Sequence, residues 1–470
     1  MSWVGFFTLS PDGNPRRFEL KGAPLGIRFD MKIMSVVGAR PNFMKVAPII
    51  AAIRERNSEI TVSRSLNGSQ AAEEPIQHVL VHTGQHYDQL MSGSFFEDLN
   101  LPKPDVHMDV GSSSHAIQTA DIMRRFEAVL LQEKPEVVVV VGDVNSTVAC
   151  AMVSAKISWD NSGTRPLIAH VEAGLRSFDR SMPEEINRIL TDHLSDLLFV
   201  TEKSGLRNLA REGLSSDKVH FVGNTMIDSL LAYKDKADAS LVLDQLGLRK
   251  DVTNNGSRHS IAPYALVTLH RPGNVDNPDA LLNILDGLVD LTAQYPVVFP
   301  AHPRTRNRIR DFGLNHYFEP NHQPPGSSGP NAAVESGAIR MIEPLGYLDF
   351  VCLMKNAQLV VTDSGGIQEE TTCLGVPCVT VRENTERPIT LKVGTNRLAG
   401  IHTGGIRDAI RRQLRKKPGK GMPEKWDGKS GVRILEVIEK EVRDKTAQKR
   451  DTSAPVYRND QEHGRVGQYV

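Results

Sequence analysis

The fold of this 470-residue chain is decided by the stretch Val137-Val138-Val139-Val140-Val141-Gly142-Asp143. Its five consecutive valines form an apolar run of strand length, and the run ends in a glycine and an acidic residue. Strands of a parallel sheet are covered by helices on both faces and therefore read as unbroken apolar runs. The stretch predicts a buried parallel strand that carries Asp143 just past its carboxyl end.

Comparable short runs alternate with helical patterns along the first half of the chain, which is typical of parallel sheets flanked by helices. The further predicted strands are Lys32 to Val37, Gln77 to Thr83, Leu167 to Val171, Leu197 to Val200 and Val219 to Val222. Amphipathic patterns from Asn42 to Arg56 and from Ile117 to Leu131 predict helices between them. Together these elements predict one doubly wound domain.

A second set of elements follows the polar stretch Lys234 to Ser260, in which we expect a charged helix and then a loop. The set comprises strands at Tyr264 to Thr268, Val297 to Ala301, Ile339 to Ile342, Leu359 to Thr362 and Cys378 to Val381, with a helix at Asp279 to Gln294. The predicted fold class is therefore α/β, with two Rossmann-like doubly wound domains and a cleft between them.

The chain is expected to divide into five segments. Residues 1–30 are expected to be an N-terminal extension, 31–230 the first domain and 231–428 the second. Residues 429–448 should form a C-terminal helix that packs back on the first domain, and the apolar-poor residues 449–470 a disordered tail. The segments Ser63 to Pro75 and Asn321 to Ser336 are rich in polar residues, Pro and Gly, and predict surface loops.

Bulk composition argues against several classes of partner. The 56 basic and 56 acidic residues cancel, which leaves no overall field to attract nucleic acid or an anionic membrane. No apolar run approaches the roughly 20 residues that a membrane-spanning helix needs. The cysteines Cys150, Cys352, Cys373 and Cys378 show no zinc-ligand spacing, which favours buried thiols in a reducing, cytoplasmic compartment and no metal site.

The first polar motif is Gly38-Ala39-Arg40-Pro41-Asn42-Phe43-Met44-Lys45, which follows the first predicted strand and opens a helix. Arg40 and Lys45 near a helix N-terminus suit a phosphate group. The spacing matches neither the dinucleotide fingerprint nor the P-loop, so NAD and ATP chemistry lose support. A plain tight turn with solvated charges remains the alternative for this motif alone.

Three candidate proton-transfer carboxylates lie after strands of the first domain. Asp143 follows the valine run, although an acidic residue there could equally cap a helix. Glu172 lies in His170-Val171-Glu172-Ala173-Gly174-Leu175-Arg176 and needs a partner or a raised pKa if buried. Glu184 and Arg188 belong to Met182-Pro183-Glu184-Glu185-Ile186-Asn187-Arg188, where helix salt bridges are the alternative.

The second domain offers anion-binding motifs at the ends of its strands. His270-Arg271 follows one strand and suits a phosphate or a departing oxygen. The Ser364-Gly365-Gly366 turn exposes backbone N–H groups at a helix start, which is the geometry of a diphosphate cradle. Glu370, one turn into that helix, could accept the hydroxyls of a ribose, and Arg387 adds a cation.

Taken together, these motifs resemble the non-hydrolysing UDP-N-acetylglucosamine 2-epimerase family. The resemblance runs from about Met31 to Gly400 and preserves the order of the motifs, including a Gly84-Gln85-His86 element. It implies the glycosyltransferase-B architecture, a homodimer, and an isomerase that interconverts UDP-N-acetylglucosamine and UDP-N-acetylmannosamine without a cofactor. The implied route is elimination of UDP to a glycal, followed by re-addition.

The resemblance also assigns residues. It implies that Asp143, Glu172 and Glu184 move protons with Arg188 beside them, and that His270 faces the diphosphate. The implied UDP contacts are Arg40, Lys45, Phe350, Ser364, Gly365, Gly366, Glu370 and Arg387. Asp143 and Glu172 are the first candidates for proton transfer, and the sequence does not decide which of them acts at C2.

Two alternatives stay open at this point. Relatives acting on UDP-2,3-diacetamido-glucuronate share nearly the same motifs, so the sugar is not readable from the sequence. A glycosyltransferase of the same architecture would hold UDP similarly, but it has no need of several carboxylates around Asp143 and Glu172.

Tyr87-Asp88 follows the Gly84-Gln85-His86 element where a basic residue is usual, which argues against activation by substrate.

Overall fold

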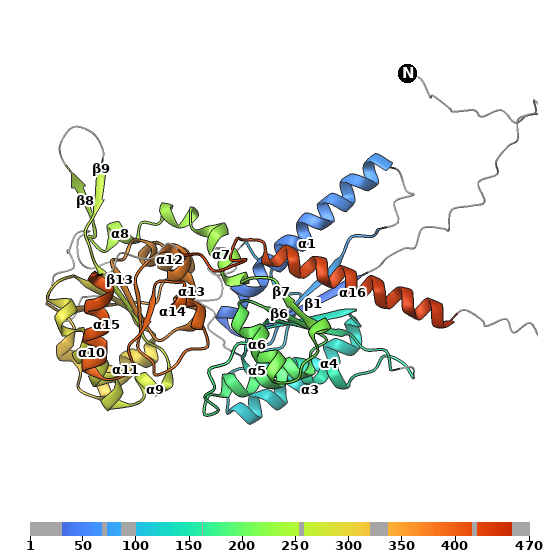
Figure 1. Cartoon of the computed structure of the whole chain (residues 1–470), viewed down its shortest axis with the longest axis horizontal. Helices are drawn as coiled ribbons and strands as arrows, with labels where there is room; N and C mark the ends of the chain where they lie inside the picture. Colours follow the sequence, from blue (N-terminus) through green and yellow to red (C-terminus); the bar gives the residue numbers. More distant parts are fainter. Residues whose placement is uncertain are drawn as a thin grey trace, which may run out of the picture.

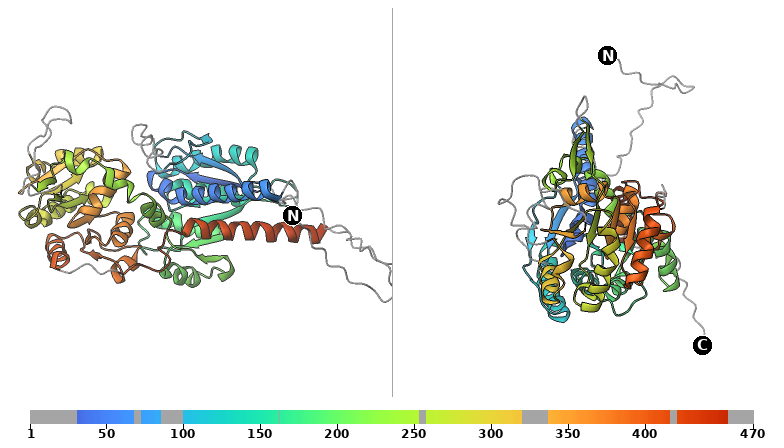
Figure 2. Two further views of the ribbon diagram at one scale, coloured as in Figure 1. Left: turned by 90° about the horizontal axis from the view of Figure 1, so that it is seen from above. Right: turned by 90° about the vertical axis from the view of Figure 1, so that its left-hand side faces the viewer.

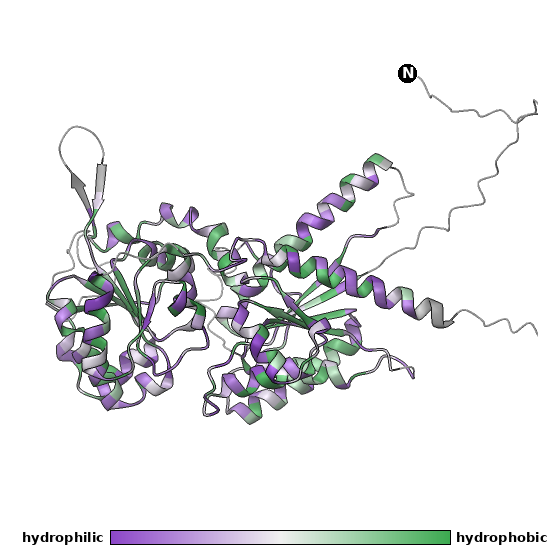
Figure 3. Ribbon diagram, in the orientation of Figure 1, coloured by the Kyte–Doolittle hydropathy of each residue, from purple (hydrophilic) through white to green (hydrophobic). Residues whose placement is uncertain are grey.

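The computed structural model describes residues 31–67, 73–85, 100–161, 163–252, 258–319, 337–415 and 421–453. These residues form two lobes, each built on a parallel sheet with helices packed against it (Figure 1). Apolar residues concentrate in the strands at the centre of each lobe, as Figure 3 shows. The predicted α/β class with two doubly wound sheets is confirmed.

The first sheet has seven strands in the order β3-β2-β1-β4-β5-β6-β7, all parallel. Its strands are β1 (Lys32–Val37), β2 (Gln77–His82), β3 (Val106–His107), β4 (Val137–Val141), β5 (Leu167–Ala173), β6 (Leu197–Val200) and β7 (Val219–Phe221). The six predicted strands are all present, while the two-residue β3 was not predicted.

The valine run forms β4, in the middle of this sheet. Val137 pairs with Ile33 of β1 on one side and with Leu167 of β5 on the other. Alternate valines point to opposite faces, so Val138 and Val140 join one hydrophobic cluster, while Val137, Val139 and Val141 join another. Burial on both faces explains why the run has no polar residue.

The second sheet has six parallel strands in the order β12-β11-β10-β13-β14-β15. They are β10 (Ala265–Thr268), β11 (Val297–Pro300), β12 (Ile339–Ile342), β13 (Leu359–Thr362), β14 (Cys378–Thr380) and β15 (Asn396–Leu398). Both sheets therefore share the 3-2-1-4-5-6 strand order of doubly wound nucleotide-binding folds. The short, polar β15 was not predicted.

Helices connect these parallel strands. Those of the first lobe are α1 (Arg40–Asn67), α3 (His115–Glu133), α4 (Asn145–Lys156), α5 (Pro183–Leu194), α6 (Lys203–Arg211) and α7 (Thr225–Tyr233). Those that follow are α8 (Val242–Gln245), α9 (Pro272–Val275), α10 (Pro278–Thr292), α11 (Pro303–Asp311), α12 (Tyr347–Asn356), α13 (Gly365–Leu374), α14 (Pro388–Lys392), α15 (Thr403–Arg415) and α16 (Ser430–Ser453). Single 3-10 turns occur at η2 (Ser216–Lys218), η3 (Lys236–Ala239) and η4 (Asn315–Tyr317).

The two lobes are joined where α7 packs on α1 of the first lobe and on α13 of the second. The chain returns to the first lobe before α16. There the buried Trp426 donates its indole N–H to the carbonyl of Thr201 in the first lobe at 3.1 Å. The final helix α16 packs on α1 near its own start (Figure 2), and the two helices diverge toward their far ends, as Figure 1 shows. Its apolar residues Ile434 and Ile438 are buried in the same cluster as Ile33 of β1.

Three boundaries differ from the sequence-based expectation. The expected loop after Lys250 contains β8 (Arg249–Val252) and β9 (Arg258–Ile261), which pair antiparallel. These strands bond to each other rather than to an apolar sheet, so hydrophobic content did not reveal them. Helix α1 continues past Ser63 to Asn67, and α16 continues into the expected tail as far as Ser453.

The other expectations at the chain ends and insertions fall on residues outside the described ranges. These are the extension at residues 1–30, the segment from Asn321 to Ser336, the Tyr87-Asp88 pair and the tail beyond Ser453. Within the part of the chain that the structure describes, no helix has the length and apolar character needed to cross a membrane.

Replacement of Trp426 by alanine should lower the free energy of unfolding by about 3–5 kcal/mol, because a fully buried indole is removed from an interface of several elements. Urea titration followed by circular dichroism measures the change. Trp426→Phe keeps most of the buried ring and should lose less. A loss below about 1 kcal/mol for the alanine variant would show that the returning segment does not depend on this side chain.

Candidate active site

The polar residues of both sheets lie at corresponding points of the topology. In the first sheet, strand order reverses between β1 and β4, and in the second between β10 and β13. Open α/β sheets bind ligands just beyond the carboxyl ends of the strands at such a switch point. Arg40 and Asp143 follow the first pair of strands, while His270 and Ser364 follow the second pair.

A cavity of about 840 Å³ lies between the two lobes at these strand ends. The first lobe contributes Asp143 and Glu184 to its lining, and the second contributes His270, Arg271 and Arg382. The predicted cleft is therefore present, and two of the three candidate carboxylates face it together with the candidate histidine.

Glu172 holds an unusual position at the end of β5. Its φ is +76°, and the register with β6 shifts between Val171 and Ala173, so a bulge re-aims this side chain. The carboxylate is buried at 2% exposure and lies 2.5 Å from Lys45 Nζ and 2.7 Å from Arg387 Nη2. Arg387 belongs to the second lobe, so this ion pair joins the two lobes.

The charge state of Glu172 follows from these neighbours. Burial by itself raises the pKa of a carboxyl group, but Lys45, Arg387 and Arg188 outweigh it and bring the pKa of Glu172 to about 2. Glu172 is therefore ionised at neutral pH and anchors two cations. A carboxylate held in this way is a weak base.

Asp143 pairs with Arg188, which is 2% exposed and also lies 4.0 Å from Glu172. Asn187 donates its side-chain amide to the Asp143 carbonyl at 3.0 Å. Asp143 keeps 21% of its side chain exposed, so it is positioned by the protein and still open to the cavity. The helix-capping alternative receives no support, because the N-cap of α4 is Val144 and makes no side-chain cap bond.

Glu184 and Glu185 begin α5 and have different environments. Glu185 is buried and accepts hydrogen bonds from the backbone N–H groups of Ser177 and Phe178, so it fixes the preceding loop. Glu184 is half-buried and lines the cavity. The Met182 sulfur of the same loop lies 3.9 Å from nitrogen atoms of both Arg271 and Arg382 in the second lobe.

His270 is oriented by Asp363, a buried residue that sequence reasoning did not single out. The Asp363 carboxylate lies 2.9 Å from His270 Nδ1 and accepts the backbone N–H groups of His270 and Arg271. Burial raises the pKa of Asp363, but His270 and these N–H donors bring it below its ordinary value. The His270 ring remains 56% exposed and faces the cavity.

The Ser364-Gly365-Gly366 turn begins α13, as predicted, with Ser364 at the N-cap position. A Cβ atom on Gly365 would lie 2.6 Å from Glu386 Oε1, so a larger residue there would displace the end of the Glu386 side chain. Glu370 is buried in the same helix and accepts a 3.4 Å hydrogen bond from the Tyr347 hydroxyl.

The remaining predicted UDP contacts have varied placements. Phe350 lies half-buried on α12 against the core cluster. Arg40 is the first residue of α1, and its side chain is outside the described part of the chain. Lys45 and Arg387, predicted to contact UDP, are both engaged by Glu172.

Arg387 is also paired with Glu369, a second residue that the sequence did not single out. Arg387 Nε lies 2.8 Å from Glu369 Oε1, although the two are not aligned for a hydrogen bond. Burial and the charges of Glu172 and Glu202 raise the pKa of Glu369 to about 8 against the opposing effect of Arg387. Its position beside Glu370 was a signal, but only the fold shows that Glu369 lies against Arg387.

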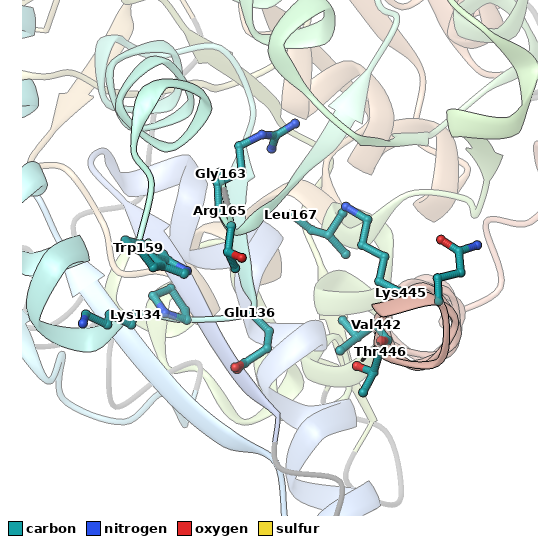
Figure 4. Close-up of a pocket in the computed structure, with 12 residues that line it drawn as sticks. Lys134, Glu136, Trp159, Gly163, Arg165, Leu167, Val442, Lys445 and Thr446 are labelled. Carbon is teal, nitrogen blue, oxygen red and sulfur yellow. Dashed lines mark hydrogen bonds between the residues drawn. The ribbon is translucent and has the colours of Figure 1, made fainter. Parts of the chain in front are cut away.

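A further cavity, of about 590 Å³, lies at the opposite, amino ends of β4 and β5, beside α16 (Figure 4). Arg165 at this cavity is paired with both carboxylate oxygens of Asp196, and Glu136 accepts the backbone N–H of Lys32. These charges serve contacts within the protein, and doubly wound sheets place ligands at the other end of the strands. The cavity between the lobes is therefore the candidate site.

Glu369→Gln should change how stability depends on pH. Because its pKa is raised in the folded state, Glu369 stays protonated there at pH values at which the same residue of the unfolded chain is ionised. Its contribution to the free energy of unfolding is therefore fully present below about pH 4.5 and is lost as pH rises through about 8. The glutamine variant has no such loss. Between pH 5 and pH 8, its free energy of unfolding, measured by urea titration, should therefore rise by about 1–3 kcal/mol relative to that of the wild type.

Glu343→Gln, which makes the same change at an exposed carboxylate paired with Arg306, is the matched control. A difference between Glu369→Gln and the wild type that does not vary with pH would show that Glu369 is ionised in the folded protein.

Comparison with known proteins agrees with this geometry. The family profile described as UDP-N-acetylglucosamine 2-epimerase matches residues 69–439. The UDP-N-acetylglucosamine 2-epimerase of Methanocaldococcus jannaschii is 39% identical over 419 residues, which cover 87% of this chain and 99% of the relative. A UDP-2,3-diacetamido-2,3-dideoxy-D-glucuronate 2-epimerase of Pseudomonas aeruginosa is 36% identical, covering 87% of this chain and 100% of its own length.

The crystal structure of the Methanocaldococcus jannaschii UDP-GlcNAc 2-epimerase in complex with UDP-GlcNAc and UDP is also similar. It superimposes with a TM-score of 0.71 and 39% identity, covering 87% of this chain and 100% of that one. The resemblance seen in the motifs, the cavity at both switch points and these similarities agree. The chain belongs to the UDP-N-acetylglucosamine 2-epimerase family.

Proposed function

We propose that this protein is a non-hydrolysing UDP-N-acetylglucosamine 2-epimerase, an isomerase that inverts C2 of the sugar. The observation that carries the proposal is the cavity between the lobes, where Asp143 and Glu184 on one wall oppose His270 and Arg271 on the other. Proton-transfer groups thereby face anion-binding groups across a space that suits a nucleotide sugar.

In the first step, a carboxylate removes the proton from C2 while the bond between C1 and the UDP oxygen breaks. The electron pair of the C–H bond becomes the C1–C2 double bond of a 2-acetamidoglucal, and UDP leaves with the electrons of the C–O bond. His270, the arginines of the second lobe and the start of α13 stabilise the charge that develops on the leaving diphosphate.

In the second step, a proton reaches C2 from the opposite face and the UDP oxygen bonds again to C1, which gives UDP-N-acetylmannosamine. Both the glycal and UDP must stay bound between the steps. The several cationic side chains of the second lobe can hold the released UDP in place. Contact between the lobes would exclude water from the intermediate.

We assign the proton transfers to Asp143 and Glu184, because both line the cavity. Glu172 is buried behind them with a pKa of about 2, which suits a positioning role toward Lys45 and Arg387 better than a base. Arg188 holds Asp143 in place. This refines the expectation from the resemblance, which named Asp143 and Glu172 first.

The sugar specificity rests on the relatives. UDP-N-acetylglucosamine is the ligand named for the Methanocaldococcus jannaschii structure, whereas the Pseudomonas aeruginosa relative is named for a diacetamido-glucuronate. The proposal therefore commits to UDP-N-acetylglucosamine and keeps the uronate as the outcome that would correct it. A homodimer in the cytoplasm that works without a cofactor, as the resemblance implies, is part of the proposal.

The reaction can be followed by NMR in deuterated water. With UDP-N-acetylglucosamine, the protein should replace the C2 proton by deuterium and accumulate the manno product. Exchange with another UDP-sugar alone would keep the chemistry and change the substrate. Absence of C2 exchange with every UDP-sugar tried would exclude the enzyme class.

Asp143→Asn should reduce turnover by about 10²–10⁴-fold, since the amide cannot accept a proton. Binding of UDP, measured by calorimetry, should stay within about threefold because Asp143 is not among the expected contacts to UDP. Asp408→Asn, on the exposed face of α15, is the matched control and should keep full activity. Turnover above about a tenth of the wild type would remove Asp143 from the mechanism.

A further inference from the structure

Arg382 is a buried cation at the candidate site for which neither the motifs nor the resemblance provides a role. It follows β14, which lies next to β13 in the sheet, so its strand end adjoins the Ser364–Gly366 turn. Its side chain is 6% exposed and lines the cavity between the lobes. Topology thus brings a third strand end to the place where the resemblance puts the diphosphate.

The contacts of Arg382 leave one side of its guanidinium without a partner. Nη2 lies 2.9 Å from Glu386 Oε2 and 3.2 Å from Asn384 Oδ1. Nη1 is buried, and within the described residues it has no hydrogen-bond partner. A buried guanidinium N–H without an acceptor is costly, so its retention indicates a partner that binds there.

Glu386 shows where an anion fits. Its Oε1 lies so close to Gly365 that a Cβ there would be 2.6 Å away, which places the carboxylate over the first residue of the ten-residue helix α13. The same oxygen lies 3.5 Å from Arg271 Nη2. A carboxylate thus lies beside the first residue of this helix and between two arginines, in a position that a phosphate group would favour.

Glu386 is ionised in this setting. Burial raises the pKa of its carboxyl group. The positive charges of Arg387, Arg382, Arg271 and Arg188 outweigh this effect and bring the pKa well below the ordinary range of a glutamate. The carboxylate therefore carries a full negative charge against the same donors that the diphosphate needs.

We propose that Arg382 binds the diphosphate of the nucleotide sugar and that Glu386 is an internal counter-anion, which the diphosphate displaces from Arg382 and from the start of α13. This inference rests on the proposed function. Competition by Glu386 lowers the affinity for UDP, and its return to Arg382 favours release of a bound nucleotide.

The opposing possibility is that Glu386 is a brace that holds Arg382 and Arg271 in their binding geometry. The two roles predict opposite signs. Removing a competitor strengthens binding of the diphosphate, whereas removing a brace weakens it. The sign of the change in Glu386→Gln therefore separates them.

Calorimetry with UDP and with uridine on the full-length protein provides the test. Arg382→Gln should weaken UDP binding by about tenfold or more, because a charge-assisted contact to the diphosphate is lost. Glu386→Gln should strengthen UDP binding by about three- to tenfold. Neither change should alter uridine binding by more than about twofold, since uridine has no diphosphate. Glu343→Gln, an exposed carboxylate of the same lobe, should change neither ligand.

Several outcomes would overturn the inference. UDP binding that is unchanged in Arg382→Gln excludes the contact, and weaker UDP binding in Glu386→Gln identifies a brace. A wild type that binds no UDP contradicts the proposed function as well. Should Arg382→Gln not fold, as judged by circular dichroism, Arg382→Lys keeps the charge but loses the planar fork. It should then show a smaller weakening toward UDP, and wild-type affinity would count against the contact.

Discussion

The buried ion pair between Glu172 and Arg387 is the contact on which the arrangement of the site depends. Two charges from different lobes lie 2.7 Å apart with almost no access to solvent. Removing charges from water is costly, and the cost is offset only while every partner is present. Lys45 completes the set of charges on the first lobe. Separation of the lobes would break this set, so the pair ties their position to the charges of the site.

The repeated sheet topology explains why so few residues suffice to build the site. Each lobe uses the same strand order, so each has one switch point where loops diverge and leave a crevice. With the two crevices facing each other, one lobe supplies carboxylates and the other supplies anion-binding groups. The Met182 sulfur between Arg271 and Arg382 shows that the loop leading to Glu184 also contacts the second lobe directly. The loop that leads to the proton-transfer residue Glu184 therefore also contacts the arginines proposed to bind the diphosphate.

Much of the fold follows from hydrophobic pattern, because strands buried on both faces cannot contain solvated residues. The runs at β1, β4 and β13 are predicted with accurate bounds for this reason. Short or polar elements escape the pattern: β3 has two residues, β15 reads Asn396-Arg397-Leu398, and the β8–β9 pair is charged. Their stability comes from hydrogen bonds to a neighbour, which local sequence does not encode.

The sequence by itself determined the class of chemistry, since parallel strands must place Asp143, His270 and the Gly365-Gly366 turn at the ends where ligands bind. Tertiary structure decided how those groups are used. Glu172 has the residue type of a base, yet burial beside Lys45 and Arg387 makes it an anchor. Glu369 and Arg382 were not singled out from the sequence, and they matter because the fold buries Glu369 against Arg387 and places Arg382 at the cavity between the lobes. The sequence states which residues can carry a charge, whereas burial and neighbouring charges, which set their pKa values, depend on the packing of distant segments.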